Sequence, residues 1–481
     1  MSQFRCFLGG KKKIFIFSSI KSIVQKTPAA PSASIAMPMN FQKAIANSLK
    51  AQASRLKARF HEVGNEDEVM ASTNGGLVAT ETMIVNEASV ANVNWLRDRY
   101  GMEVVQEGRF GKLLLQSPEG GQAGVKIAFE ASCKLVETGK AESSHPNFLR
   151  WSPRPNSAST SGYESNWGIN NPGDPGKYGA DVHGLAAWTI SQGAPGTRIA
   201  VLDEGVDTKH PWLKSAVVDE ADFVDDNNHA MPDNNDAHGT ACAGIIFSQH
   251  KKVQGLAPKC QLVAVRIAKS DVLGKNWIID DFDTADAIDW SWKEGRSSVL
   301  SNSWSGGMPT DAITNAIERA RTQGRNGKGA VVIFAAGNLN VPIYYPSNLP
   351  GILTVGASNQ WDERKSPTSK DGEHFWGSNY GPCLDLLAPG VGIATTDIRG
   401  AKGYSDTLFY GSFNGTSSAT PHVAAVAGLI LSIRQDLTEA DVRKILIEST
   451  DPIAGQAGRT DKLGHGRLNA YNALRLAKRY S

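Results

Sequence analysis

A glycine-turned serine followed by a long apolar run most constrains how this chain can fold. The segment 413–425 reads FNGTSSATPHVAA. Apolar side chains then recur at helical spacing, at Val423, Val426, Leu429, Ile430 and Ile433. Gly415 permits a turn that a Cβ would hinder, and Pro421 is tolerated in a first helical turn. A buried helix is therefore expected to begin at or beside Ser417.

The start of such a helix suits a reaction that develops negative charge. It presents free backbone N–H groups and the positive end of the helix dipole beside Ser417. Ser417 is therefore a candidate nucleophile. Serine is also a favoured helix N-cap, so this segment alone leaves both roles open.

Two further segments supply groups that would activate a serine. An apolar strand ends in Asp203, and residues 236–244, DAHGTACAG, place His238 at the mouth of a small-residue helix. An imidazole titrating near pH 6.5 suits a general base, and a carboxylate can hold it in the required tautomer. Glu204 and Asp207 are competing carboxylates, but Asp203 directly ends the strand.

These three segments resemble, in chain order, the signature motifs of the subtilisin-like serine proteases. Similar motifs follow at 301–307 (SNSWSGG), 334–338 (FAAGN) and 384–390 (LDLLAPG). The resemblance covers roughly residues 180–478. It implies a serine endopeptidase that forms an acyl-enzyme on Ser417, with His238 as general base and Asp203 orienting it. A catalytically silent peptide-binding protein on the same fold is the alternative function.

The resemblance also implies roles for residues around the reaction centre. Asn338 would donate to the oxyanion together with the Ser417 N–H, although an isolated Asn after a strand would indicate a turn. Peptide substrate would bind as an extra strand. Its expected contacts are Ser303, Trp304, Ser305, Gly306, Gly274 and Leu339. Residues 303–308 and 338–346 contain no acidic side chain, so an uncharged P1 residue is expected rather than paired basic residues.

Strands alternate with helices from about residue 199 to 448, which predicts an α/β, subtilisin-like three-layer fold with a mainly parallel central sheet. A small α+β unit precedes it, with a last short strand expected over 134–137. This unit resembles the inhibitory prodomain of secreted relatives; an unrelated interaction domain is the alternative. The expected domains of the zymogen are a basic leader and helical appendage (1–75), the prodomain-like unit (76–150), a linker (151–178) and the catalytic domain (179–481).

The N-terminal stretch is strongly basic. Its first 61 residues contain eleven Lys or Arg and no Asp or Glu. This asymmetry fits an organelle transit peptide, a weak secretory signal, or a dispensable stretch before a start at Met37 or Met39. The protein would be secreted or organelle-targeted in the first two cases and cytoplasmic otherwise. Residues 41–61 have the spacing of a basic amphipathic helix.

The overall composition limits the classes of partner that are expected. A net charge of +2 gives no reason to expect nucleic acid, and no stretch approaches the ~18 consecutive apolar residues of a membrane span. Five scattered cysteines do not support a disulfide framework. Cys242, one helical turn after His238, is expected to be a buried packing residue. We expect a monomer whose partners are peptide or protein substrates and its own prodomain.

Serine chemistry requires no cofactor, and a structural metal stays unknown. Many relatives hold calcium through an Asp shortly after the catalytic one and through a loop after the His helix. Trp212 stands at the first position and 248–253 is short and basic, so that site is expected to be lost. Four carboxylates remain, at Asp225, Asp226, Asp233 and Asp236. They would either bind a cation, which prefers carboxylate oxygens, or form a solvated acidic loop.

Overall fold

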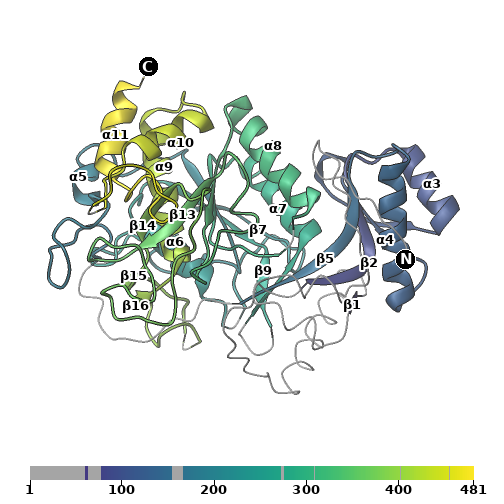
Figure 1. The fold of residues 1–481 in the computed structure, drawn as a ribbon, viewed down its shortest axis with the longest axis horizontal. Helices are drawn as coiled ribbons and strands as arrows, with labels where there is room; N and C mark the ends of the chain where they lie inside the picture. Colours follow the sequence, from purple (N-terminus) through teal and green to yellow (C-terminus); the bar gives the residue numbers. More distant parts are fainter. Residues whose placement is uncertain are drawn as a thin grey trace. The chain divides into compact units, whose positions relative to one another are not determined.

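The computed structural model describes residues 60–62, 77–153, 166–233, 235–271, 276–307, 309–400, 402–453 and 455–480. These residues form two compact units (Figure 1). The first unit contains the described residues up to Pro153 together with 270–286 and 307–313, and the second contains the rest. The two later segments of the first unit come from the part of the sequence expected to be catalytic.

The second unit is built on a parallel sheet. Its strands are β6 (Arg198–Asp203), β7 (Val217–Asp222), β8 (Gln261–Arg266), β11 (Val299–Asn302), β12 (Val331–Ala335), β13 (Leu353–Ser358) and β14 (Leu386–Pro389). They lie in the order β14-β13-β12-β11-β6-β8-β7, and every pairing is parallel. The predicted α/β fold with a mainly parallel sheet is confirmed.

Helices cover this sheet. They are α5 (Gly184–Trp188), α6 (His238–Phe247), α9 (Thr416–Ile433), α10 (Glu439–Glu448) and α11 (Ala470–Arg479), while α7 (Asp281–Lys293) and α8 (Asp311–Gly327) have residues in both units. Ile199 and Val201 of β6 pack into one core cluster with α6 and α9. The alternate residues Ala200 and Leu202, which point to the other face, are equally buried. Burial of both faces is typical of an all-parallel sheet.

Helix α9 lies in the middle of this core. It is the one helix of the described chain that is long and apolar enough to cross a membrane, and 89% of it is buried inside the fold. It begins at Thr416, beside Ser417 as expected. Pro421 lies inside the helix, however, and not in its first turn as the sequence suggested. Because proline has no N–H, the Ser417 carbonyl four residues earlier lacks the usual i+4 hydrogen bond of the helix.

Several edge elements were not expected from the sequence. They are β7, β9 (Ala268–Ser270), β14, α5, α11, and the antiparallel pair β15 (Ile393–Thr396) and β16 (Phe409–Phe413). β7 reads VVDEAD and is only half-buried, so it lacks the apolar run that marked the central strands. Short or polar elements of this kind give weak periodic signals.

The first unit is an antiparallel sheet with two helices. Its strands are β1 (Phe60–Glu62), β2 (Leu77–Val85), β3 (Glu103–Glu107), β4 (Leu113–Gln116), β5 (Ser144–Pro153) and β10 (Asn276–Asp280). They pair in the order β3-β4-β2-β5-β10, with β1 on β2. Helices α3 (Val90–Tyr100) and α4 (Gly121–Glu137) contribute to a core that includes Met83, Leu96 and Leu115.

Two local expectations in this unit are wrong. Residues 134–137, expected as a strand, form the last turn of α4, because Leu135 continues the buried helical face of Ala128 and Ala131. Phe60–Glu62 form a strand where the end of a helix was expected. The rest of that helix and the basic leader lie outside the described residues.

Candidate active site

Three elements of the second unit carry the expected reacting groups to the carboxyl edge of the parallel sheet. Asp203 is the last residue of β6, His238 is the first of α6, and Ser417 is the second of α9. Their exposed fractions are 2%, 0% and 3%. In open parallel sheets, this edge is where ligands bind.

Asp203 and His238 are in direct contact. His238 Nδ1 lies 2.9 Å from Asp203 Oδ1 and 3.1 Å from Oδ2. With Nδ1 as the donor, Nε2 is the acceptor nitrogen of the neutral ring. The edge of Phe413 packs against the imidazole with 5.3 Å between ring centroids. Asp207 instead binds Arg399 Nε at 2.8 Å, so Asp203 is the carboxylate that orients the imidazole.

The start of α6 approaches the end of β6 very closely. A Cβ at Gly239 would lie 2.1 Å from the Gly205 carbonyl oxygen and 2.9 Å from Asp203 Cβ. Only glycine allows this approach. The glycine that follows His238 therefore sets the distance between the imidazole and the Asp203 carboxylate.

Ser417 is held by Ser303 through two hydrogen bonds. Ser417 Oγ donates to the Ser303 carbonyl at 3.0 Å, and Ser303 Oγ donates to the Ser417 carbonyl at 3.0 Å. The second bond serves the carbonyl that Pro421 leaves without a helix donor. Proton transfer to His238 requires the Ser417 hydroxyl to rotate away from the Ser303 carbonyl.

Cys242 lies between the base and the nucleophile. Its Sγ is 3.8 Å from His238 Nδ1 and 3.6 Å from the Ser417 carbonyl, to which it donates. Burial, followed by the charge of Asp203, raises the pKa of this thiol well above its usual range. The prediction of a buried packing residue is confirmed, and the thiol adds a weak bond to the Ser417 carbonyl.

Asn338 is oriented by the first residue of α9. Its Oδ1 accepts from the backbone N–H of Thr416 at 2.9 Å and from Thr416 Oγ1 at 3.0 Å. This network assigns the oxygen of the amide and leaves Nδ2 as a donor. Gly415 has φ +116°, and a Cβ there would lie 3.2 Å from Asn338 Nδ2. The absence of a side chain at Gly415 thus leaves the space beside Asn338 Nδ2 open. No local sequence pattern indicates this role of Thr416.

The expected substrate contacts differ in exposure. Ser303 and Trp304 are buried, and Trp304 packs edge-to-face on Phe334 at 5.0 Å. The Gly306 N–H donates to the Tyr345 carbonyl at 2.9 Å. Ser305 is half-buried, and Leu339, beside Asn338, is 46% exposed. Gly274 lies outside the described residues. The structure thus joins Ser303 to the nucleophile and leaves Leu339 open to a ligand.

An arginine lies among the candidate calcium ligands. Arg266 occupies the acidic loop and binds Asp222 at 3.0 Å, Asp225 at 2.9 Å and Asp233 at 2.6 Å. Arg266 thus pairs with two of the four candidate carboxylates, while Asp226 and Asp233 are exposed to solvent, as expected for a solvated acidic loop. Among the described residues, the group with metal-binding spacing is Asp203, His238 and Cys242, which is the site above.

Aromatic rings fill the position near Trp212, where many relatives hold calcium and where the sequence predicted that the site is lost. Trp212 packs edge-to-face on His250 with 4.9 Å between centroids, and His250 lies 4.4 Å from Phe409. An indole, an imidazole and a phenyl ring provide no hard oxygen ligands. The side chains at this position therefore do not fit calcium.

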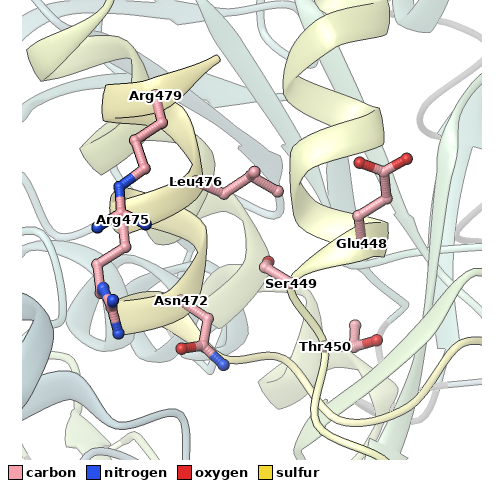
Figure 2. Close-up of a pocket in the computed structure, with 7 residues that line it drawn as sticks. All are labelled: Glu448, Ser449, Thr450, Asn472, Arg475, Leu476 and Arg479. Carbon is pink, nitrogen blue, oxygen red and sulfur yellow. The ribbon is translucent and has the colours of Figure 1, made fainter.

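Two surface hollows lie elsewhere in the second unit. The first has about 270 Å³ and lies between α10 and α11 (Figure 2). Its lining is Glu448, Ser449, Thr450, Asn472, Arg475, Leu476 and Arg479. Ser449 Oγ and Thr450 Oγ1 donate to backbone carbonyls of the same region. The second hollow has about 530 Å³ and includes Lys293, Arg296, Arg325 and Lys328. Neither contains a residue of the candidate active site.

Comparison with known proteins matches the part of the chain that contains Asp203, His238 and Ser417. A family model described as the subtilase family matches residues 194–469. The chain belongs to the subtilase family. This subtilase is 34% identical over 312 residues to thermitase of Thermoactinomyces vulgaris, covering 63% of this chain and 99% of thermitase. It is 30% identical over 446 residues to the calcium-dependent protease of Trichormus variabilis, covering 83% of this chain. The chain spans 64% of the length of that relative.

Solved structures share the fold. Fervidolysin of Fervidobacterium pennivorans aligns with a TM-score of 0.61 at 20% identity, covering 82% of this subtilase and 60% of fervidolysin. A protease of Pseudoalteromonas arctica aligns with a TM-score of 0.54 at 24% identity, covering 65% of this chain and 98% of that one. At these identities the likeness shows the fold alone.

The orientation of Asn338 yields a prediction for turnover. We expect Asn338→Ala to lower kcat about 10²–10³-fold with little change in KM, because one oxyanion donor is lost and acts in the transition state. Steady-state peptide hydrolysis checks this. Asn348→Ala, at an exposed Asn in the same segment, is the control. A kcat for Asn338→Ala within about threefold of wild type would remove the assignment.

Proposed function

We propose that this subtilase is a serine endopeptidase that hydrolyses peptide bonds through an acyl-enzyme on Ser417. The observation that carries the proposal is the Asp203–His238 hydrogen bond of 2.9 Å at the sheet edge where α9 presents Ser417. Relatives named thermitase, thermophilic serine proteinase and subtilisin support it. The alternative is a peptide-binding protein that keeps the fold without the reaction.

The residues support a two-step mechanism. Ser417 Oγ attacks the scissile carbonyl carbon while its proton passes to His238 Nε2, and Asp203 stabilises the imidazolium. The tetrahedral oxyanion accepts from Asn338 Nδ2 and from the Ser417 N–H. The C–N bond then breaks as His238 returns the proton to the leaving amine. Water, with His238 again as base, cleaves the acyl-enzyme and releases the carboxylate product.

This chemistry uses only residues of the chain. The name calcium-dependent protease describes the relative from Trichormus variabilis and not this chain. The reaction itself needs no metal ion.

Covalent labelling tests the activity directly. We expect a fluorophosphonate to label Ser417 of the wild-type protein, because the probe needs an activated serine, and to leave Ser417→Ala unlabelled. Ser418→Ala is the matched control, since Ser418 Oγ is buried and donates to the Phe413 carbonyl. Peptide mass spectrometry locates the adduct. A folded wild-type protein without an adduct would favour the silent peptide-binding alternative.

We also propose that the P1 side chain of the substrate is uncharged. The described residues near the nucleophile, 303–307 and 338–346, contain no acidic side chain, and Leu339 is exposed beside Asn338. A cationic P1 group would be desolvated there without a partner.

Paired synthetic peptides test this preference. We expect kcat/KM for substrates with Leu or Phe at P1 to exceed that for Arg-Arg substrates by about tenfold or more. The reason is that burying a cation without a partner costs more free energy than one hydrogen bond contributes. Leu339→Ala is expected to weaken the preference. Hydrolysis of the Arg-Arg peptide as fast as the Leu peptide would overturn the proposal.

We further propose that the chain is made as a zymogen whose residues 76–150 act as an inhibitory prodomain. The support lies inside the first unit, where β5 pairs antiparallel with β10. Arg150 of β5, which is buried, forms a two-pronged ion pair with Asp281, with Nη2 2.8 Å from Asp281 Oδ2. Asn147 Nδ2 donates to Asp280 Oδ2 at 2.9 Å. The prodomain-like strand is thus bonded to the start of α7.

The ion pair gives a test on the full-length chain. We expect peptide hydrolysis to begin after a lag, during which mass spectrometry finds a new N-terminus between about residues 150 and 178. Arg150→Ala should shorten the lag, because Asp281 is left buried and unpaired, which costs about 3–5 kcal/mol. Arg97→Ala, which removes an exposed pair with Glu103, is the control. Full activity of the uncut chain without a lag would contradict the proposal.

A further inference from the structure

Glu204 is a buried carboxyl group that the mechanism above does not use. It follows Asp203 directly in the chain, and its side chain is fully buried. The sequence presented it only as a rival to Asp203 for the imidazole. In the structure it binds His238 at another atom: Glu204 Oε1 accepts from the His238 backbone N–H at 2.7 Å.

This bond supplies a cap that α6 lacks in its own sequence. A helix leaves its first N–H groups without partners inside the helix, and an N-cap side chain commonly accepts from one of them. The N-cap of α6 is Ala237, which makes no side-chain bond. Glu204 accepts instead, from the loop after β6. An ionised carboxylate at this place would also suit the positive end of the helix dipole.

Glu204 and Asp203 thus hold His238 as a connected pair. Asp203 Oδ1 binds the imidazole at 2.9 Å and also accepts from the Glu204 N–H at 2.9 Å. One carboxylate therefore fixes the ring and the other fixes the backbone of the same residue.

The other titratable groups around His238 act differently. Cys242 stays neutral, since burial and then the charges of Asp203 and Glu204 raise the pKa of its thiol. Asp207 is paired with Arg399 at 2.8 Å. Asp236 is buried two residues before His238, on the loop that enters α6. Among these groups, Glu204 is the one bonded to the His238 backbone.

The geometry points to Glu204 as a positioning residue of the reaction, which fixes His238 through its backbone and stabilises the imidazolium formed when Ser417 gives up its proton. The inference rests on the proposed role of His238 as general base. An ionised Glu204 would stabilise the imidazolium, so we expect removal of its charge to shift the acid limb of the pH–rate profile to lower pH. This dependence on pH distinguishes a residue that positions His238 for the reaction from one that only caps helix α6.

Two substitutions separate charge from hydrogen bonding. Glu204→Gln removes the charge and keeps an oxygen acceptor, whereas Glu204→Ala removes both. In each variant we expect the acid-limb midpoint of kcat/KM to fall by about 0.5–1 pH unit. Glu204→Ala should also lose about tenfold or more in kcat, and Glu204→Gln about threefold or less. Asp207→Asn, a buried carboxylate of the same loop, is the control and should move the midpoint by less than about 0.2 unit.

A readout without hydrolysis keeps the inference separate from the proposed function. In the Ser417→Ala background, an NMR titration of the His238 imidazole should give a lower pKa with Glu204→Gln than without it. If the wild-type protein hydrolyses nothing while Glu204→Gln still lowers the pKa in this titration, the protease function fails and the role of Glu204 stands. Unchanged midpoints in both measurements, even with a lower Tm, would overturn the inference and leave the function standing. If Glu204→Ala does not fold, the Gln variant and the titration decide.

Discussion

The structure of the site depends on one hydrogen bond inside the protein, between the Asp203 carboxylate and His238 Nδ1 at 2.9 Å. Both side chains are almost completely buried, so water does not compete for the carboxylate or weaken its field. A buried carboxylate is costly unless it is bonded, and here His238 and the Glu204 N–H bind it. The bond fixes which nitrogen of the ring carries the proton, and therefore which nitrogen can accept one.

The fold supplies this bond by bringing three distant segments to one edge. Parallel pairing of β6, β8 and β11 places the ends of the strands together, and α6 and α9 begin where the strands end. Small residues then allow close approach at the two helix starts, at Gly239 and Gly415. Pro421 adds a less obvious contribution. It frees the Ser417 carbonyl from the helix, and Ser303 Oγ binds this carbonyl at 3.0 Å.

The sequence predicted the parts of this arrangement that local patterns encode. The central strands, the helices and the positions of Asp203, His238 and Ser417 at element ends follow from apolar periodicity and glycine placement. The roles of Thr416 and Glu204 were not predicted, because each residue acts through a contact between segments far apart in the chain. A single sequence does not show such pairs. The same reason explains why the ion pairs of Arg266 with Asp222 and Asp225 were not predicted for this acidic loop, which was expected to be solvated or to bind a cation. The one available sign was Pro421 itself. It cannot donate to the Ser417 carbonyl four residues earlier, so this carbonyl needs a donor from another segment.

The central claim is that the three side chains act as one unit, and a double-mutant cycle measures this most directly. The values needed are kcat for the wild type, His238→Ala, Ser417→Ala and the double variant on one peptide substrate. Residues that act together are strongly non-additive, so the account predicts that the double variant is about as slow as either single variant. Losses that multiply, with the double variant slower by the product of the single effects, would contradict it.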